Sequence, residues 1–279
     1  MSRALVLGGG GLTGISWEWG ILSGLAAAGV DLSDADLVVG TSAGSMVGAQ
    51  VASGLDFQER FRAQFVPLPP GPPTRLARRD LARSAWAVLS SRASDGVGAR
   101  LGRIALGAET PSEDEHARLI RSRLPVREWP DRPLMITAVD AGTGTFTVFD
   151  RSSGATLLEA VGASCAVPGV YPPVTIGGRR YIDGGARSST NADLAAGYRS
   201  VVVIAPNTQG FRAIESVAGH VRALRRAGSE VALISPDARS RRVFGRDSLD
   251  SARRPPAAGA GRRQAASIAD TVAAVWEAR

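Results

Sequence analysis

The residues of this 279-residue chain best suited to chemistry are a serine and an aspartate, each set among glycines. Ser42 is the centre of a G-x-S-x-G pattern that follows an apolar strand-like run and precedes a helix-like run. In a strand–turn–helix of this kind, a strained turn exposes the serine hydroxyl as a nucleophile. Gly40 and Gly44 suit the pattern because side chains there would clash with the adjoining strand and helix. The alternative interpretation is an ordinary glycine-rich turn.

A second glycine-rich segment, residues 8–14, also joins a strand-like run to a helix-like run. Its successive glycines let bare backbone N–H groups approach an anion, because no Cβ stands between them. One interpretation is an oxyanion hole. Another is a dinucleotide fingerprint, G-x-G-x-x-G at 9–14, whose acidic partner would be one of the aspartates at 31–36. The serine turn favours the oxyanion hole, since acyl transfer needs an exposed serine and nucleotide binding does not.

A serine nucleophile needs a base, and the chain offers more than one candidate. Asp183 opens an Asp-Gly-Gly turn at the end of a short strand, where its side chain can reach out of the sheet, although Asp-Gly turns are also common. His116 and His220 lie in charged segments, which favours solvated side chains for both. The order Ser42, Asp183, His220 is nevertheless that of an α/β-hydrolase triad, so His220 remains an alternative base.

The elements that would position these residues alternate along the chain. Buried strands are predicted at 4–7, 37–39, 134–139, 201–204 and 231–234, and helices at 15–28, 43–53 and 157–164. Hairpins are predicted at 134–149 and 174–182. This order is typical of an α/β three-layer sandwich with a mostly parallel central sheet.

Two regions depart from the regular alternation. Residues 56–130 contain a proline cluster and an Arg-rich stretch with apolar residues at helical spacing between 76 and 89, so we expect a helical insertion or cap there. Residues 235–263 are rich in Arg, Pro and Gly and are expected to be partly loop, followed by a terminal helix at 267–276.

Composition excludes several kinds of site. All 33 basic residues are arginines, so a catalytic lysine is excluded. A single cysteine, Cys165, excludes an internal disulfide and multi-cysteine metal sites, and two histidines exclude a His-rich one, so no metal is expected. The chain has no apolar run of 18 residues and no secretory signal at its start, which predicts a cytoplasmic protein.

The net charge of +7 raises the question of an anionic partner. Arginines cluster at 75–83 and 239–246 and could contact anionic lipid head groups or nucleic acid phosphates. No aromatic interleaving or binding motif accompanies them, so no nucleic acid is expected. Transient contact with an anionic membrane surface stays open, as does an Arg-rich lipid-surface binding protein on a vestigial hydrolase fold. The oligomeric state is unknown from sequence.

In order and spacing, the glycine-rich segment, the serine turn and the Asp-Gly-Gly turn resemble the patatin-like phospholipase family over about residues 4–196. Residues 162–174 are also similar to the segment that precedes the family's Asp-Gly-Gly/Ala motif. The resemblance implies a Ser42–Asp183 dyad without histidine, which hydrolyses carboxylic esters of lipids or phospholipids through an acyl-Ser42 intermediate. It implies no cofactor.

The resemblance also assigns the glycines. The oxyanion would be held by backbone amides of Gly9, Gly10, Gly11 and Leu12, and the motifs would be supported by Gly14, Gly40, Gly44, Gly184 and Gly185. Many family members carry Arg or Lys where this chain has Thr13. The neutral Thr13 supplies no such cation beside the oxyanion loop. The implied organisation is an acyl hydrolase domain at 4–196, including the 56–130 insertion, and a 197–279 extension that completes the same fold.

Overall fold

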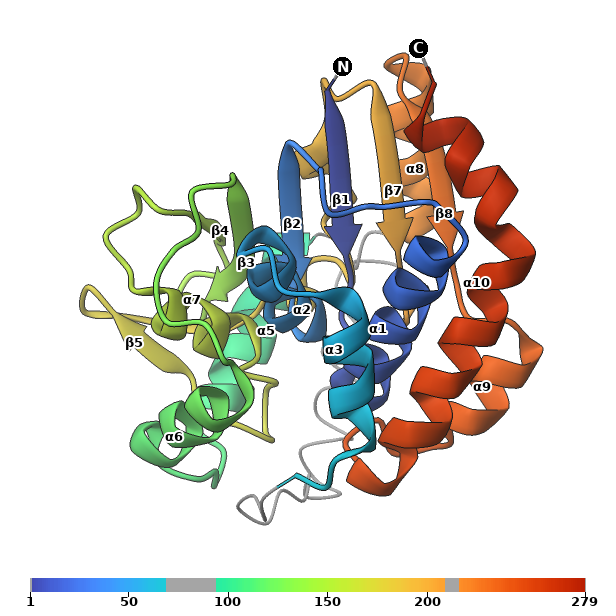
Figure 1. The fold of residues 1–279 in the computed structure, drawn as a ribbon. Helices are drawn as coiled ribbons and strands as arrows, with labels where there is room; N and C mark the ends of the chain where they lie inside the picture. Colours follow the sequence, from blue (N-terminus) through green and yellow to red (C-terminus); the bar gives the residue numbers. More distant parts are fainter. Residues whose placement is uncertain (1, 69–93, 209–215, 279) are drawn as a thin grey trace.

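The computed structural model describes residues 2–68, 94–208 and 216–278 (Figure 1). The arginine cluster at 75–83 and the predicted helical spacing between 76 and 89 lie outside the described residues. The described part of the 56–130 segment is largely helical, with α3 (Phe57–Arg62), the 3₁₀ turn η1 (Ala63–Phe65), α5 (Ser94–Leu106) and α6 (Glu113–Arg123).

A mixed sheet of eight strands forms the centre of the described structure, in the order β5-β6-β3-β2-β1-β7-β8 with β4 also paired to β3. The strands are β1 (Arg3–Leu7), β2 (Leu37–Thr41), β3 (Leu134–Asp140), β4 (Phe146–Phe149), β5 (Val174–Ile176), β6 (Arg179–Asp183), β7 (Ser200–Ile204) and β8 (Glu230–Ile234). Strands β3, β2, β1, β7 and β8 run parallel, whereas β4 and β6 are antiparallel to β3.

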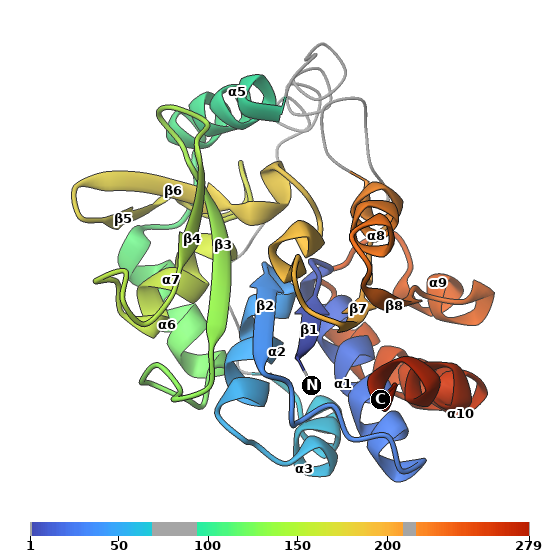
Figure 2. The ribbon, with the colours of Figure 1, turned by 90° about the horizontal axis from the view of Figure 1, so that it is seen from above.

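Helices cover both faces of this sheet, which makes three layers (Figure 2). One face carries α1 (Gly11–Ala27), α2 (Ala43–Ala52), α7 (Leu157–Ser164) and α10 (Arg254–Trp276), and the other carries α5 and α8 (Val217–Arg226). In β1, Leu5 and Leu7 pack in the core of the first face, while Ala4 and Val6 pack in that of the second. Burial on both faces explains why the central strands are continuous apolar runs. The α/β three-layer prediction is confirmed.

The C-terminal region differs from the sequence expectation. Much of the stretch expected to be partly loop is helical, because α9 (Ala238–Phe244) lies within it and α10 begins at Arg254, before the expected 267. Two prolines in the first turn of α10 start a helix rather than break it, since the first N–H groups have no intrahelical acceptor. Glycines inside α10 allow close packing on α1: a Cβ at Gly261 would lie 2.3 Å from the Trp17 carbonyl oxygen.

Among the described residues, none of the helices combines the length and the apolar character needed to cross a bilayer.

Candidate active site

Ser42 lies on a sharp turn between β2 and α2. Its φ of 52° falls in the left-handed region, which a non-glycine residue rarely adopts and which stores strain. A Cβ at Gly44 would lie 2.1 Å from the Leu7 carbonyl oxygen, and one at Gly40 would lie 2.6 Å from the Ser45 Cα. These two contacts are the physical reason that both positions are glycine.

Hydrogen bonds hold the strained Ser42 backbone in place from both sides. Its N–H donates to Ser164 Oγ at 2.9 Å, and its carbonyl oxygen accepts from Ser45 Oγ at 2.7 Å and from Cys165 Sγ at 3.3 Å. Ser164 was not indicated by any sequence pattern beyond its place in the 162–174 segment. These bonds engage the backbone of Ser42 and leave its side-chain hydroxyl available for chemistry.

Asp183 ends β6 and meets Ser42 across the sheet. Strand β3 pairs with the end of β2 through Thr41 and Thr137, and with the end of β6 through Asp183 and Ala138, so the two strand ends meet at neighbouring positions of β3. The Ser42 side chain lies close enough to the Asp183 carboxyl to favour its charged form and so to lower its pKa. Strand register thus brings together two residues that lie far apart in the sequence.

The environment of Asp183 tunes its proton affinity. The residue is 5% exposed, and burial raises the pKa of its carboxyl to about 6, against the opposing effects of Ser42 and of the Gly185 N–H. The Gly185 N–H donates to Asp183 Oδ1 at 2.7 Å. A Cβ at Gly184 would lie 2.3 Å from Thr137 Oγ1, so the turn after Asp183 fits tightly against β3. A carboxylate with a pKa near 6 suits a general base at neutral pH.

The glycine-rich segment leads into the N-terminus of α1 beside Ser42, and the four residues Gly9 to Leu12 all line the same cavity. The Gly9 N–H, however, donates to the Ser189 carbonyl oxygen at 2.8 Å, so this amide is committed within the fold. The amides that remain available for an oxyanion in this segment are therefore those that follow Gly9. The amides of Gly10, Gly11 and Leu12 belong to the helix start, where N–H groups lack intrahelical acceptors and favour anions.

A cavity of about 830 Å³ opens over Ser42 and Asp183. Much of its wall is apolar, with side chains from α1, α2, α5 and α6: Leu12, Ile15, Met46, Leu101, Leu119 and Ile120. Arg123 and Arg246 add positive charge to the lining. An apolar cavity with a few convergent polar groups is the usual form of a small-molecule binding site.

Neither histidine is among the described residues that line this cavity. His116 is 1% exposed, with Nε2 2.9 Å from the Gly162 carbonyl oxygen, and burial lowers its pKa. His220 is 5% exposed, and its Nδ1 lies 3.5 Å from Asp193 Oδ1. The expectation that both are solvated is wrong, because both side chains are buried in the fold. The arrangement also gives no support to His220 as the base for Ser42.

Cys165 lines the cavity beside Ser42 but is poorly suited to act as a nucleophile. Burial and the nearby Asp183 charge raise the pKa of its thiol to about 12. The thiol therefore stays protonated at neutral pH and donates to the Ser42 carbonyl oxygen.

A layered α/β fold with a strained serine beside an apolar cavity is the arrangement typical of hydrolases with a nucleophilic serine. Residues 5–196 match the model of the family described as patatin-like phospholipase, and the chain belongs to that family. The description of this family is that of lipid acyl hydrolases. The resemblance found in the sequence motifs is confirmed.

Two solved structures are similar to this chain. VipD from Legionella pneumophila is 14% identical with a TM-score of 0.48, and the match covers 97% of this chain and 66% of VipD. The type III effector protein ExoU is 15% identical with a TM-score of 0.42, and the match covers 97% of this chain and 53% of ExoU. The chain thus spans about two thirds of VipD and about half of ExoU. No curated protein sequence matches it.

Proposed function

We propose that this chain hydrolyses carboxylic esters of lipids through an acyl-Ser42 intermediate, with Asp183 as the general base. The observation that carries the proposal is the placement of the Ser42 side chain beside the buried Asp183 carboxyl, whose charged form it favours, on the wall of an apolar cavity. The carboxylate can take the hydroxyl proton directly, which removes the need for a histidine between the two residues.

In the first half of the reaction, Ser42 Oγ attacks the ester carbonyl carbon while its proton moves to Asp183. The carbonyl oxygen becomes an oxyanion, and the amides of Gly10, Gly11 and Leu12 at the start of α1 are placed to stabilise it. Collapse of this intermediate breaks the ester C–O bond, and Asp183 returns the proton to the leaving alcohol.

In the second half, a water molecule attacks the acyl carbon as Asp183 accepts one of its protons. A second oxyanion forms at the same amides, the bond to Ser42 Oγ breaks, and the proton returns from Asp183 to the serine. The products are an alcohol and a fatty acid, and both residues regain their starting states.

The cavity lining indicates which esters fit. Its apolar side chains from α1, α2, α5 and α6 suit an acyl chain, and Arg123, the last residue of α6, adds one half-buried positive charge. The positive charge of Arg123 acts to lower the pKa of the Cys165 thiol, which lies next to Ser42. No described carboxylate forms an ion pair with Arg123. A lipid ester with an anionic head group would supply the missing partner.

The proposed substrate class is tested with two esters that share one acyl chain, the neutral 1-oleoylglycerol and the anionic 1-oleoylglycerol phosphate. Wild type is expected to release oleate from both. Arg123→Gln is expected to lower kcat/KM for the anionic ester about 10- to 100-fold and to spare the neutral one, because hydrogen bonds to charged groups contribute about 1.5–3 kcal/mol.

The two parts of this proposal fail separately. Wild type that releases no oleate from either ester would contradict ester hydrolysis. Equal losses on both esters in Arg123→Gln would contradict only the head-group role of Arg123.

Transient contact with an anionic membrane is a further part of the proposal. Arg246, in the loop after α9, lines the cavity, so contact of this surface with a membrane would bring the cavity opening against the lipid. The surface consists of exposed arginines on α9 and in that loop: Arg239, Arg241, Arg242 and Arg246. Each is expected to contribute about 1 kcal/mol near an anionic surface. We expect sedimentation with phosphatidylglycerol vesicles at low salt that weakens at 0.5 M salt. Absence of binding at low salt would contradict this contact.

A further inference from the structure

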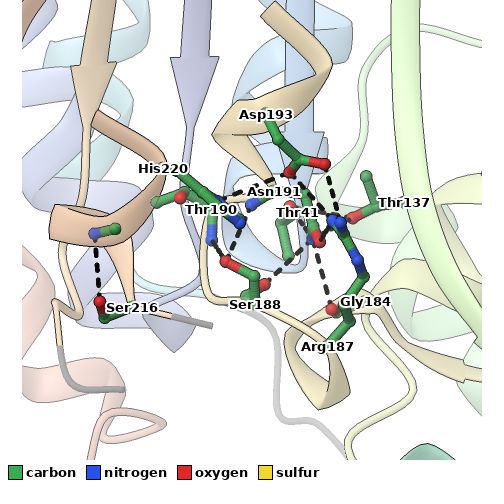
Figure 3. Close-up of polar contacts among 11 residues, drawn as sticks. Thr41, Thr137, Gly184, Arg187, Ser188, Thr190, Asn191, Asp193, Ser216 and His220 are labelled. Atoms are coloured by element: carbon green, nitrogen blue, oxygen red, sulfur yellow. Dashed lines mark hydrogen bonds and ion pairs between the residues drawn. The ribbon is translucent and has the colours of Figure 1, made fainter. Parts of the chain in front are cut away.

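A buried polar network surrounds Asn191, in the segment between Asp183 and β7 (Figure 3). Asn191 is fully buried and has a φ of 47°, a left-handed conformation that asparagine tolerates better than most residues. Its Nδ2 lies within hydrogen-bond distance of four acceptors: Thr41 Oγ1 at 3.1 Å, Thr137 Oγ1 at 3.2 Å, Gly184 O at 3.3 Å and Ser188 O at 3.0 Å.

These acceptors belong to the segments that hold the two proposed reacting groups. Thr41 directly precedes Ser42, and Gly184 directly follows Asp183. Thr137 of β3 lies between them, with its Oγ1 2.9 Å from Thr41 Oγ1. One amide nitrogen carries two hydrogens, so these contacts are shared among several acceptors around a single centre.

The opposite side of Asn191 fixes the orientation of its amide. Arg187 donates to Asn191 Oδ1 at 2.9 Å and makes a two-point ion pair with Asp193, at 2.9 and 2.7 Å. Arg187 also lies over the ring of Phe146 at 4.2 Å, which packs the guanidinium in place. With its oxygen held by Arg187, Asn191 must turn its nitrogen toward Thr41 and Gly184 (Figure 3).

We propose that Asn191 is a positioning residue that sets the distance between the Ser42 hydroxyl and the Asp183 carboxylate. Its side chain is not among the described residues that line the cavity, so it acts through the peptides beside the two groups rather than on substrate. The proposal rests on the Ser42–Asp183 dyad proposed above. A misplacement of about 1 Å between reacting groups can cost about 100-fold in rate.

The test replaces Asn191 by glycine, which accepts a φ of 47° and removes only the side-chain hydrogen bonds. We expect kcat to fall about 100-fold while KM stays within about threefold, because positioning of the dyad changes and the cavity does not. The rate constant for inactivation by a fluorophosphonate is expected to fall in parallel with kcat, since it depends on the same Ser42–Asp183 geometry.

Gln264 of α10 provides a matched control. It is a buried amide with a similar number of partners: Nε2 donates to Ser235 O at 2.7 Å, and Oε1 accepts from Trp17, Asp237 and Ser240. It is not among the described residues that line the cavity. Gln264→Ala is expected to lower Tm as Asn191→Gly does, but to keep kcat within about twofold.

A second variant covers the case in which Asn191→Gly does not fold. Asn191→Asp keeps the size, the tolerance of positive φ and the bond from Arg187, but an ionised carboxylate cannot donate to the Gly184 and Ser188 carbonyls. It is expected to lower kcat about tenfold or more. Wild-type kcat in either variant, or a loss in Asn191→Gly no larger than in Gln264→Ala, would overturn the positioning role. If the proposed Ser42–Asp183 dyad itself is wrong, Ser42→Ala would instead keep full activity.

Discussion

Ser42→Ala is expected to lower kcat/KM for ester hydrolysis by about 10⁴-fold or more, because no other group can form the acyl intermediate. The variant keeps its fold: the bonds that hold the turn involve the Ser42 backbone, which alanine also has. Hydrolysis of p-nitrophenyl butyrate gives the rate, and a thermal unfolding curve confirms that the native structure is retained.

Two companion variants separate chemistry from backbone strain. Ser42→Gly relieves the left-handed strain at φ 52° and is expected to be inactive yet more stable than Ser42→Ala by about 1 kcal/mol. Cys165→Ala is expected to keep most of the activity, because its thiol is protonated at neutral pH. Full activity in Ser42→Ala would contradict the acyl-serine mechanism.

Asp183→Asn is expected to lower kcat/KM about 10²- to 10⁴-fold, the range that general-base catalysis contributes. In the wild type, burial raises the pKa of Asp183 to about 6, and only the carboxylate can accept the Ser42 proton. The kcat/KM of the wild type should therefore rise with pH through about 6 and then level off. A pH profile that is flat between 5 and 8 would contradict the role of Asp183 as base.

The same raised pKa predicts a stability effect of opposite sign to the activity effect. Between about pH 4 and pH 6 the folded state binds more protons at Asp183 than the unfolded state, so stability falls as pH rises through this window. Above pH 6 the folded protein carries the full cost of a buried carboxylate. Asp183→Asn removes that cost and is expected to be more stable than wild type at pH 8, by up to about 3 kcal/mol.

Urea unfolding at pH 8 and at pH 4 measures this difference. The gain in the free energy of unfolding of Asp183→Asn should be present at pH 8 and should shrink toward pH 4, where wild-type Asp183 is protonated when folded. Equal stability of the two proteins at pH 8 would show that the buried carboxylate carries no such cost.

The parts of this site that could be predicted from sequence are those fixed by local geometry. A glycine on each side of Ser42 reflects steric contacts within one strand–turn–helix unit, so the pattern alone indicates the turn. The glycines before α1 are likewise a local requirement of a helix that begins beside the Ser42 turn. The strands of the parallel sheet were also predictable, because burial on both faces leaves continuous apolar runs.

The parts that could not be predicted depend on register and long-range packing. The antiparallel pairing of β6 with β3 is what brings Asp183 to Ser42, and no local pattern encodes it. Asn191 joins strands that are distant in sequence, and the commitment of the Gly9 amide depends on Ser189. Burial of His116 in a charged helix likewise follows from packing that composition does not reveal.

Labelling with a fluorophosphonate followed by peptide mass mapping tests the central claim most directly, because the reagent reacts covalently with a serine activated by a base. We predict that at pH 8 the wild type is labelled on the peptide that contains Ser42, that labelling slows when pH falls below about 6, and that Asp183→Asn is labelled far more slowly. No label on Ser42, or equally fast labelling of Ser42 in wild type and Asp183→Asn, would contradict the Ser42–Asp183 dyad.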